Sequence, residues 1–184
     1  RFDKLDSFLF NSVSILNGYG PTEGTVCSTF FNVQSSSRKV QNLPIGKPIQ
    51  NTLVYILDKH HRLLPYGSIG EICIGGAGLA RGYLNREELT KEKFIDNPYK
   101  PGERIYRTGD LGRWNEDQNL EYLGRIDDQV KIRGYRIELG EIESVLSQHE
   151  QVTAVVVVAK SISGEEKELI AYTTGEAEAS ELKS

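Results

Sequence analysis

The chain has 184 residues, of which 38% are hydrophobic and 26% charged, and its 22 basic and 26 acidic side chains leave a net charge of −4 with neutral histidines. This composition is typical of a globular protein and argues against a basic nucleic-acid-binding domain. Its apolar runs are strand-sized, well short of the roughly 18–20 residues that span a bilayer, so we expect no membrane span.

The first two-thirds of the chain is expected to consist of β-strands joined by tight turns. Segments rich in β-branched residues predict buried strands at 12–17, 52–57 and 70–74, and the polar segment 35–39 predicts a surface loop. One helix is expected over 85–95, with Asn85 as its N-cap. Short strands are expected near 105–106 and 120–123.

The last third of the chain has a different pattern. Apolar residues at helical spacing predict a helix over 138–149 with one apolar face. A fully buried strand is expected at 152–159 and a second strand at 168–173. A β-rich part followed by a helix and two strands predicts an α+β protein with two unequal parts.

The two cysteines, Cys27 and Cys73, lie outside any CxxC pattern. We expect them to be buried thiols of a cytoplasmic protein, not a disulfide framework or a zinc site. The chain contains no methionine, even at its first position, which favours a segment excised from a longer protein.

A Gly/Pro turn follows the first predicted strand, with the sequence NGYGPTE at 17–23. It places an aromatic ring, a hydroxyl and a carboxylate close together. A ring can stack on a base, a hydroxyl can donate to phosphate, and a carboxylate can hold magnesium. The same residues equally suit an ordinary β-turn that starts a helix.

The segment 70–83 is rich in glycine and follows a predicted strand. It lacks the GxGxxG pattern of a dinucleotide-binding loop. Its glycines are expected to serve turns and close backbone packing.

The segment YRTGD at 106–110 places Asp110 at a predicted turn before another strand. An acidic residue there can accept both hydroxyls of a ribose, as in dinucleotide sites. A plain Asp-containing turn explains the residue equally well.

The charged segment 124–138 lies between the two predicted parts. Alternating apolar and charged residues from 129 to 132 predict an exposed β-hairpin. A seam of this kind is where a hinge would lie, although a solvated hairpin with surface ion pairs accounts for the pattern too.

Taken together and in this order, four segments resemble core motifs of the adenylation domains of nonribosomal peptide synthetases, within the adenylate-forming superfamily. They read NGYGPTE, GEICIGGAGLARGYL, YRTGDLGRW and GRIDDQVKIRGYRIELGEIE. The resemblance implies a β-rich subdomain with a distorted barrel at 1–126, the C-terminal part of the large adenylation subdomain. It also implies a hinge and a truncated small α+β subdomain at 127–184.

The resemblance implies a nucleotide site around the first motif. Tyr19 would stack on adenine and Gly20 would lie against the nucleotide. Thr22 would contact phosphate and Glu23 would bind magnesium, so these two carry the catalytic roles.

Further roles follow from the third and fourth motifs. Asp110 would hold the ribose hydroxyls, and Arg125 would lie near the nucleotide. Asp127 matches the hinge about which the small domain rotates. Lys131 and Gly134 would line the passage for phosphopantetheine.

The resemblance also places Gly18, Val26 and Cys27 in the amino-acid pocket. Their size hints at a small to medium apolar substrate side chain.

The implied reaction joins an amino acid and ATP into an aminoacyl-adenylate and pyrophosphate. The acyl group then passes to phosphopantetheine on a peptidyl carrier protein. The expected ligands are ATP or AMP and magnesium, and a small activator protein is a further partner in some members. The family's phosphate loop, its substrate-binding aspartate and its Asn-Gly-Lys lysine have no counterpart in the chain, so we expect the chain alone to be inactive.

Two alternatives remain. The chain can be a non-catalytic module that binds a carrier protein or an activator protein. It can also derive from an acyl- or aryl-CoA ligase, which shares the outline of the four motifs.

Overall fold

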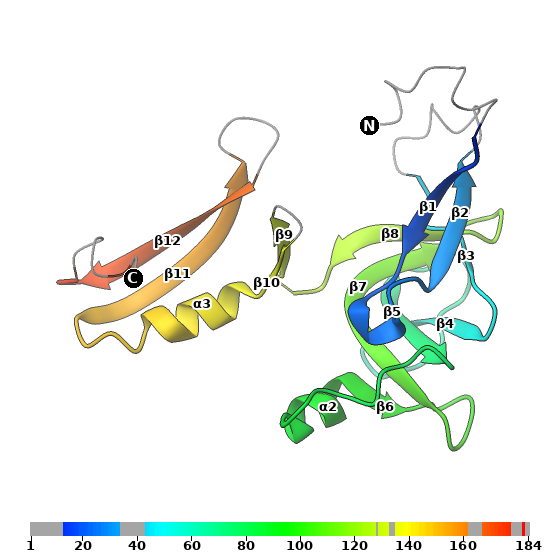
Figure 1. The fold of residues 1–184 in the computed structure, drawn as a ribbon, viewed down its shortest axis with the longest axis horizontal. Helices are drawn as coiled ribbons and strands as arrows, with labels where there is room; N and C mark the ends of the chain where they lie inside the picture. Colours follow the sequence, from blue (N-terminus) through cyan, green and yellow to red (C-terminus); the bar gives the residue numbers. More distant parts are fainter. Residues whose placement is uncertain are drawn as a thin grey trace. The chain divides into compact units, whose positions relative to one another are not determined.

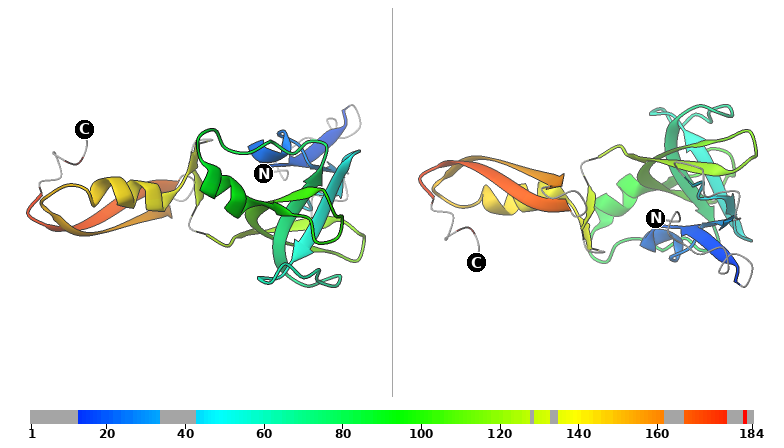
Figure 2. Two further views of the ribbon diagram at one scale, coloured as in Figure 1. Left: turned by 90° about the horizontal axis from the view of Figure 1, so that it is seen from below. Right: turned by 90° about the horizontal axis from the view of Figure 1, so that it is seen from above.

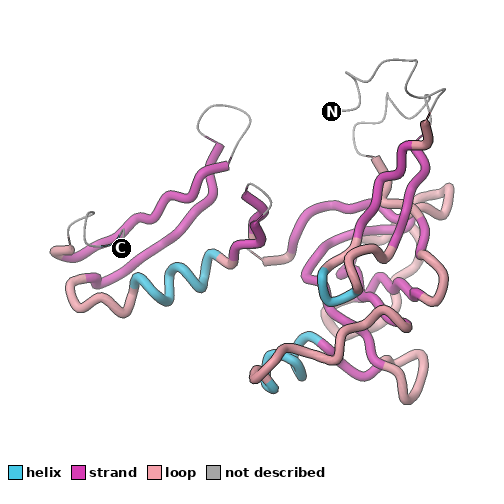
Figure 3. Tube along the Cα trace, viewed as in Figure 1, coloured by secondary structure: helices cyan, strands magenta, loops and turns pink. Residues whose placement is uncertain are grey.

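The computed structural model describes residues 13–33, 43–127, 129–132, 135–161, 167–177 and 182, so the predicted loop at 35–39 lies outside the described residues. The chain divides into two compact units, Arg1–Ile126 and Asp127–Ser184. Strands predominate in both (Figure 3). This agrees with the expected α+β class.

The first unit is built from two antiparallel sheets with curved strands (Figures 1 and 2). The three-stranded sheet has the order β1-β2-β3, with β1 at Ile15–Tyr19, β2 at Thr29–Val33 and β3 at Lys47–Pro48. The five-stranded sheet has the order β4-β5-β7-β6, and β8 also pairs with β7. Its strands are β4 at Thr52–Leu57, β5 at Gly70–Gly76, β6 at Phe94–Asp96, β7 at Arg104–Trp114 and β8 at Leu120–Arg125.

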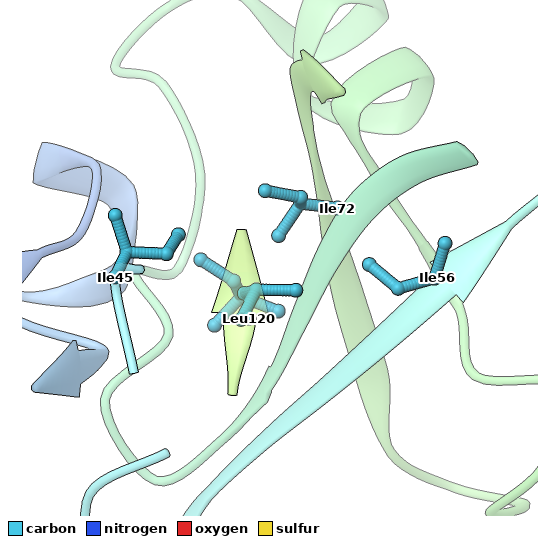
Figure 4. Close-up of a cluster of buried hydrophobic side chains, with 5 residues drawn as sticks. Ile45, Ile56, Ile72 and Leu120 are labelled. Atoms are coloured by element: carbon cyan, nitrogen blue, oxygen red, sulfur yellow. The ribbon is translucent and has the colours of Figure 1, made fainter. Parts of the chain in front are cut away.

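Strand β5 is buried on both faces and separates two apolar clusters. Alternate residues of a strand point to opposite sides. Ile72 and Ile74 therefore join one cluster, shown in Figure 4, whose other buried members are Ile45, Ile56 and Leu120. Cys73 points the other way and packs in a second cluster with Leu57 and Ile105.

Two expectations for the first unit are wrong in detail. The helix α2 spans Glu87–Lys93, shorter than expected, and its N-cap is Arg86. Asn85 has a φ of 55° and so belongs to the preceding turn. Strand β7 is much longer than expected, because it pairs with β5, β6 and β8 along its length.

The second unit contains a hairpin, a helix and a strand pair. Strands β9 (Val130–Ile132) and β10 (Tyr135–Ile137) form the expected hairpin, and Gln129 donates a hydrogen bond to Glu138. The helix α3 spans Leu139–Leu146, and it packs against β11.

The strand pair of the second unit is more exposed than the sequence indicates. Strand β11 (Val152–Ser161) pairs with β12 (Lys167–Gly175) over its whole length. Val157 is 4% exposed, and its backbone N–H donates to the Glu143 carboxylate of α3 at 2.8 Å. Val156 is 56% exposed, because neighbouring residues of a strand face opposite sides. The expectation of a fully buried strand is therefore wrong.

The two cysteines differ in accessibility, which corrects the expectation that both are buried. Cys27 is partly exposed, whereas Cys73 is fully buried and burial raises the pKa of its thiol above the ordinary range. Thiol reagents attack the thiolate. In the native chain we expect dithiobis(nitrobenzoate) to modify Cys27 at least about 100-fold faster than Cys73, because Cys73 is both protonated and inaccessible.

Absorbance kinetics followed by peptide mass spectrometry measure the two rates. Cys27→Ser is the control and should leave only the slow reaction until urea unfolds the first unit. Equal rates at the two thiols in the native chain would contradict the burial of Cys73.

Candidate functional site

The Gly/Pro motif forms the connection between β1 and β2. Tyr19 ends β1, and a short 3-10 helix, η2, follows at Thr22–Gly24. A side chain on Gly20 would place its Cβ 2.6 Å from the Val26 carbonyl oxygen, so only glycine fits there. Thr22 is exposed, whereas Glu23 is buried at 8% exposure. A turn that starts a short helix is therefore present, and it buries a carboxylate.

A polar cluster surrounds Asp110 inside the first unit. The Tyr19 hydroxyl donates to Asp110 Oδ2 at 2.5 Å, and Arg125 Nη1 donates to Asp110 Oδ1 at 2.8 Å. The backbone N–H of Asp110 donates to Thr108 Oγ1 at 2.9 Å, and that hydroxyl donates to the Ile72 carbonyl at 2.7 Å. Three predicted nucleotide-site residues, far apart in sequence, therefore meet at one carboxylate.

The strand positions explain how these residues meet. The sequence predicts Asp110 at a turn, and this is wrong. Asp110 lies within β7, where it pairs with Arg125 of β8. Gly109 has a φ of 73°, and the β7–β8 register shifts just after Leu111. Such an irregularity re-aims side chains from a regular strand. The polar sequence YRTGD reflects this irregularity within a continuing strand.

The Tyr19 side chain is half-buried and has an aromatic neighbour. Burial, together with the neighbouring Asp110 carboxylate, raises the pKa of the Tyr19 hydroxyl above its ordinary range. The hydroxyl therefore stays protonated and remains a donor to Asp110. The ring centroids of Tyr122 and Tyr19 lie 6.3 Å apart, and Tyr122 is not among the residues predicted from the sequence.

A second cluster holds Glu23. The Tyr83 hydroxyl donates to Glu23 Oε1 at 2.7 Å and lies 3.4 Å from the Tyr106 hydroxyl. Burial, followed by the hydrogen bond to Glu23, raises the pKa of Tyr83 above its ordinary range. The backbone N–H of Ala80 donates to the Glu23 carbonyl at 2.8 Å. Tyr83 was not predicted as a site residue, and the only sequence signal was its place in the glycine-rich segment.

Two of the three predicted pocket residues lie side by side. A Cβ on Gly18 would lie 3.9 Å from Cys27 Sγ and 2.9 Å from Cε1 of Phe30, its cross-strand partner. Phe30 is therefore an additional residue at this place. Val26 has a φ of 68° and is 71% exposed. Such a φ is unusual for a β-branched residue.

The residues predicted beyond the first unit are described only in part. Asp127 is exposed, and its Oδ1 accepts the N–H of Gln129 at 3.3 Å. Lys131 belongs to β9, and its side chain is not among those that the structure describes. Gly134 lies outside the described residues.

Two general features bear on ligands and location. No group of three or more His, Cys, Asp or Glu side chains in the described ranges is placed to hold a metal ion. Likewise, no described helix combines the length and the apolar character that a membrane span requires.

Comparison with known proteins agrees with the four motifs. The model of the AMP-binding enzyme family matches residues 3–84. Tyrocidine synthase 1 of Brevibacillus parabrevis is 57% identical over 164 residues, which are 89% of this chain but 15% of that protein.

Solved structures show the same fold. PA1221, an NRPS protein containing adenylation and PCP domains, matches 91% of this chain with 36% identity and a TM-score of 0.78, over 34% of its own chain. The four-domain nonribosomal peptide synthetase holo-AB3403, bound to AMP and glycine, matches 97% of this chain with 42% identity and a TM-score of 0.57, over 14% of its own. The first part of the chain thus matches the AMP-binding enzyme family, and the chain as described is similar in sequence and fold to nonribosomal peptide synthetases with adenylation domains.

Proposed function

We propose that the chain supplies part of the nucleotide site of an adenylation domain that activates an amino acid for peptide synthesis. In this reaction the substrate carboxylate attacks the α-phosphate of ATP, which gives an aminoacyl-adenylate and pyrophosphate. The observation that carries the proposal is the cluster of Tyr19, Asp110 and Arg125, built from three of the four motifs that resemble this family. The alternative of an acyl- or aryl-CoA ligase is disfavoured by the 57% identity to a peptide synthetase.

Asp110 would bind the ribose hydroxyls. Both of its oxygens already accept a hydrogen bond, one from Tyr19 and one from Arg125. Each carboxylate oxygen has two acceptor sites, so one carboxylate can accept from more than two donors. The existing bonds would fix the orientation of the carboxylate. The adjacent Tyr19 ring would stack on adenine beside Gly20.

Magnesium fits the residues around η2 only in combination with phosphate. Glu23 supplies one buried carboxylate, and the described residues hold no larger group of metal ligands there. Magnesium typically binds one or two carboxylates, substrate phosphates and waters. When bound, it would neutralise charge on the phosphate oxygens. The exposed Thr22 hydroxyl would donate to phosphate.

The pocket and partners complete the proposal. Gly18, Cys27 and Val26 would line the site for a small to medium apolar amino-acid side chain, with Phe30 beside Gly18. A peptidyl carrier protein would receive the acyl group, and a small activator protein would be a further partner. Asp127 would serve as the hinge, and Lys131 and Gly134 would line the phosphopantetheine passage. The matched relatives that combine adenylation and PCP domains support a carrier protein as partner.

Replacing Tyr19 with leucine tests the stacking role. We expect ATP with magnesium to bind the chain about 10-fold more weakly in Tyr19→Leu, since base stacking contributes about 1–3 kcal/mol and 1.4 kcal/mol is a factor of ten. Isothermal titration calorimetry measures the dissociation constant. Tyr19→Phe is the matched control, because it keeps the ring and removes only the hydroxyl that donates to Asp110.

The variants separate stacking from hydrogen bonding. Tyr19→Phe should stay within about threefold of the unsubstituted chain, because the ring carries most of the contact. If Tyr19→Leu and Tyr19→Phe bind ATP as well as the unsubstituted chain, the ring does not contact the base. If the unsubstituted chain binds no nucleotide, the proposed site is not formed by this chain.

A further inference from the structure

The glycine-rich segment at 70–83 was expected to serve turns and close backbone packing, and its part after β5 lies against the turn that carries Glu23. Thr25 Oγ1 donates to the Gly78 carbonyl at 2.6 Å. The N–H of Ala80 donates to the Glu23 carbonyl at 2.8 Å. These bonds join the segment to the middle residue of η2 and to Thr25, the C-cap of η2. The segment therefore fixes the backbone from which the Glu23 side chain projects.

The same segment also reaches the Glu23 carboxylate. The Tyr83 hydroxyl donates to Glu23 Oε1 at 2.7 Å, across 60 residues of sequence. Aromatic packing holds the phenol: the Tyr83 and Phe94 rings meet edge to face at 5.6 Å, and Phe94 lies 5.0 Å from Tyr106. The hydroxyl is thus presented by a packed side chain whose position is set by β6 and β7.

The backbone at Tyr83 is equally constrained. Its N–H donates to Thr90 Oγ1 at 2.9 Å, and that hydroxyl donates to the Arg86 carbonyl at 2.8 Å. Gly82 has a φ of 147°, and a Cβ there would lie 2.4 Å from Thr90 Cγ2. Arg104 donates to the carbonyl of Ala80 at 3.2 Å. Several independent contacts thus converge on the placement of one phenol.

We propose that Tyr83 is a positioning residue, which holds the Glu23 carboxylate in the orientation that binds a magnesium ion with the ATP phosphates. The inference rests on the proposed function, in which Glu23 is the metal-binding carboxylate. A hydrogen bond to one oxygen fixes the rotation of a carboxylate and so directs its remaining acceptor sites. Residues that orient metal ligands in this way typically contribute about 10- to 100-fold to metal affinity.

The test is calorimetric titration of ATP into the 184-residue chain, once with excess magnesium and once with EDTA. In Tyr83→Phe, we expect about 10-fold weaker ATP binding with magnesium and unchanged binding with EDTA. Tyr55→Phe is the matched control, because Tyr55 also lies in the first unit and accepts a hydrogen bond from Asn97 at 3.3 Å. It should leave both affinities unchanged.

A second measurement needs no ligand. In urea unfolding, the losses from Tyr83→Phe and Glu23→Ala should be less than additive in the double variant, since each removes the same hydrogen bond. Additive losses would overturn the inference, because the two side chains would then act independently.

The outcomes distinguish the inference from the proposed function. Equal weakening of ATP binding with magnesium and with EDTA would reduce Tyr83 to a structural role and overturn the inference alone. ATP binding by Tyr83→Phe that is unchanged both with magnesium and with EDTA would also overturn the inference alone. Absence of ATP binding by the unsubstituted chain would overturn the proposed function, and with it the metal role of Glu23 that Tyr83 serves.

Discussion

Asp110→Ala is expected to lower the free energy of unfolding of the first unit by about 3 kcal/mol, because it leaves a largely buried arginine without its carboxylate. The Arg125 and Asp110 side chains are 17% and 11% exposed, and their nitrogen and oxygen atoms lie 2.8 Å apart. The Tyr19 hydroxyl would lose its acceptor as well. With a typical urea dependence, the unfolding midpoint would fall by about 1 to 2 M.

The measurement is urea unfolding followed by the fluorescence of Trp114, the single tryptophan of the chain, which lies in β7 with Asp110. The unfolding midpoint of Asp110→Asn should lie between those of Asp110→Ala and the unsubstituted chain, because an amide keeps one acceptor oxygen and removes the charge. In the nucleotide titration, Asp110→Ala should abolish measurable binding of ATP, since it removes the proposed ribose contact.

Glu121→Ala is the matched control for the same two strands. Glu121 pairs with Arg113 at 2.8 Å, and their side chains are 21% and 44% exposed. Exposed ion pairs contribute about 0–1 kcal/mol, so this variant should change the midpoint little. A loss from Asp110→Ala no greater than that from Glu121→Ala would contradict the structural role of the Asp110 cluster.

Leu120→Ala is expected to destabilise the first unit by about 3 kcal/mol, within the range of about 2–5 kcal/mol for a buried leucine reduced to alanine. Leu120 is fully buried in the cluster of Figure 4, against Ile45, Ile56 and Ile72. Its backbone N–H also donates to the Gly46 carbonyl at 2.8 Å. The truncated side chain would leave a cavity between β8 and the segment that leads into β3.

The same Trp114 fluorescence measures this loss. Leu84→Ala is the matched control, because Leu84 is 89% exposed in the same unit and should change stability by less than about 0.5 kcal/mol. A similar result for the two variants would show that Leu120 is not packed as described. Far-ultraviolet circular dichroism should show that both variants keep their strands.

Local sequence patterns were sufficient to predict a strand where its residues are uniformly apolar or β-branched. The β-branched run at 52–57 predicted β4 to the residue. The region 105–114 was underestimated, because Thr108, Gly109 and Asp110 interrupt its apolar pattern. Its strand character comes from the pairing partners on both sides, which lie far away in sequence.

The candidate site shows the same division. Family motifs selected Tyr19, Asp110 and Arg125, and the structure brings them together. Tyr83 was not predicted as a site residue. Its partner Glu23 is 60 residues away, and the spacing of nearby residues cannot predict a contact over that distance in sequence. A glycine-rich segment predicts turns. That this segment also places the Tyr83 hydroxyl against Glu23 is seen only in the folded structure.

The end of β8 is tied to the strand that carries Asp110, directly before the second unit begins. Arg125 is paired with Asp110, and the N–H of Ile126 donates to the Gly109 carbonyl at 2.8 Å. The second unit begins at Asp127, one residue beyond this attachment. The Asp110 carboxylate and its donors Tyr19 and Arg125 therefore all lie in the first unit, on the N-terminal side of this boundary.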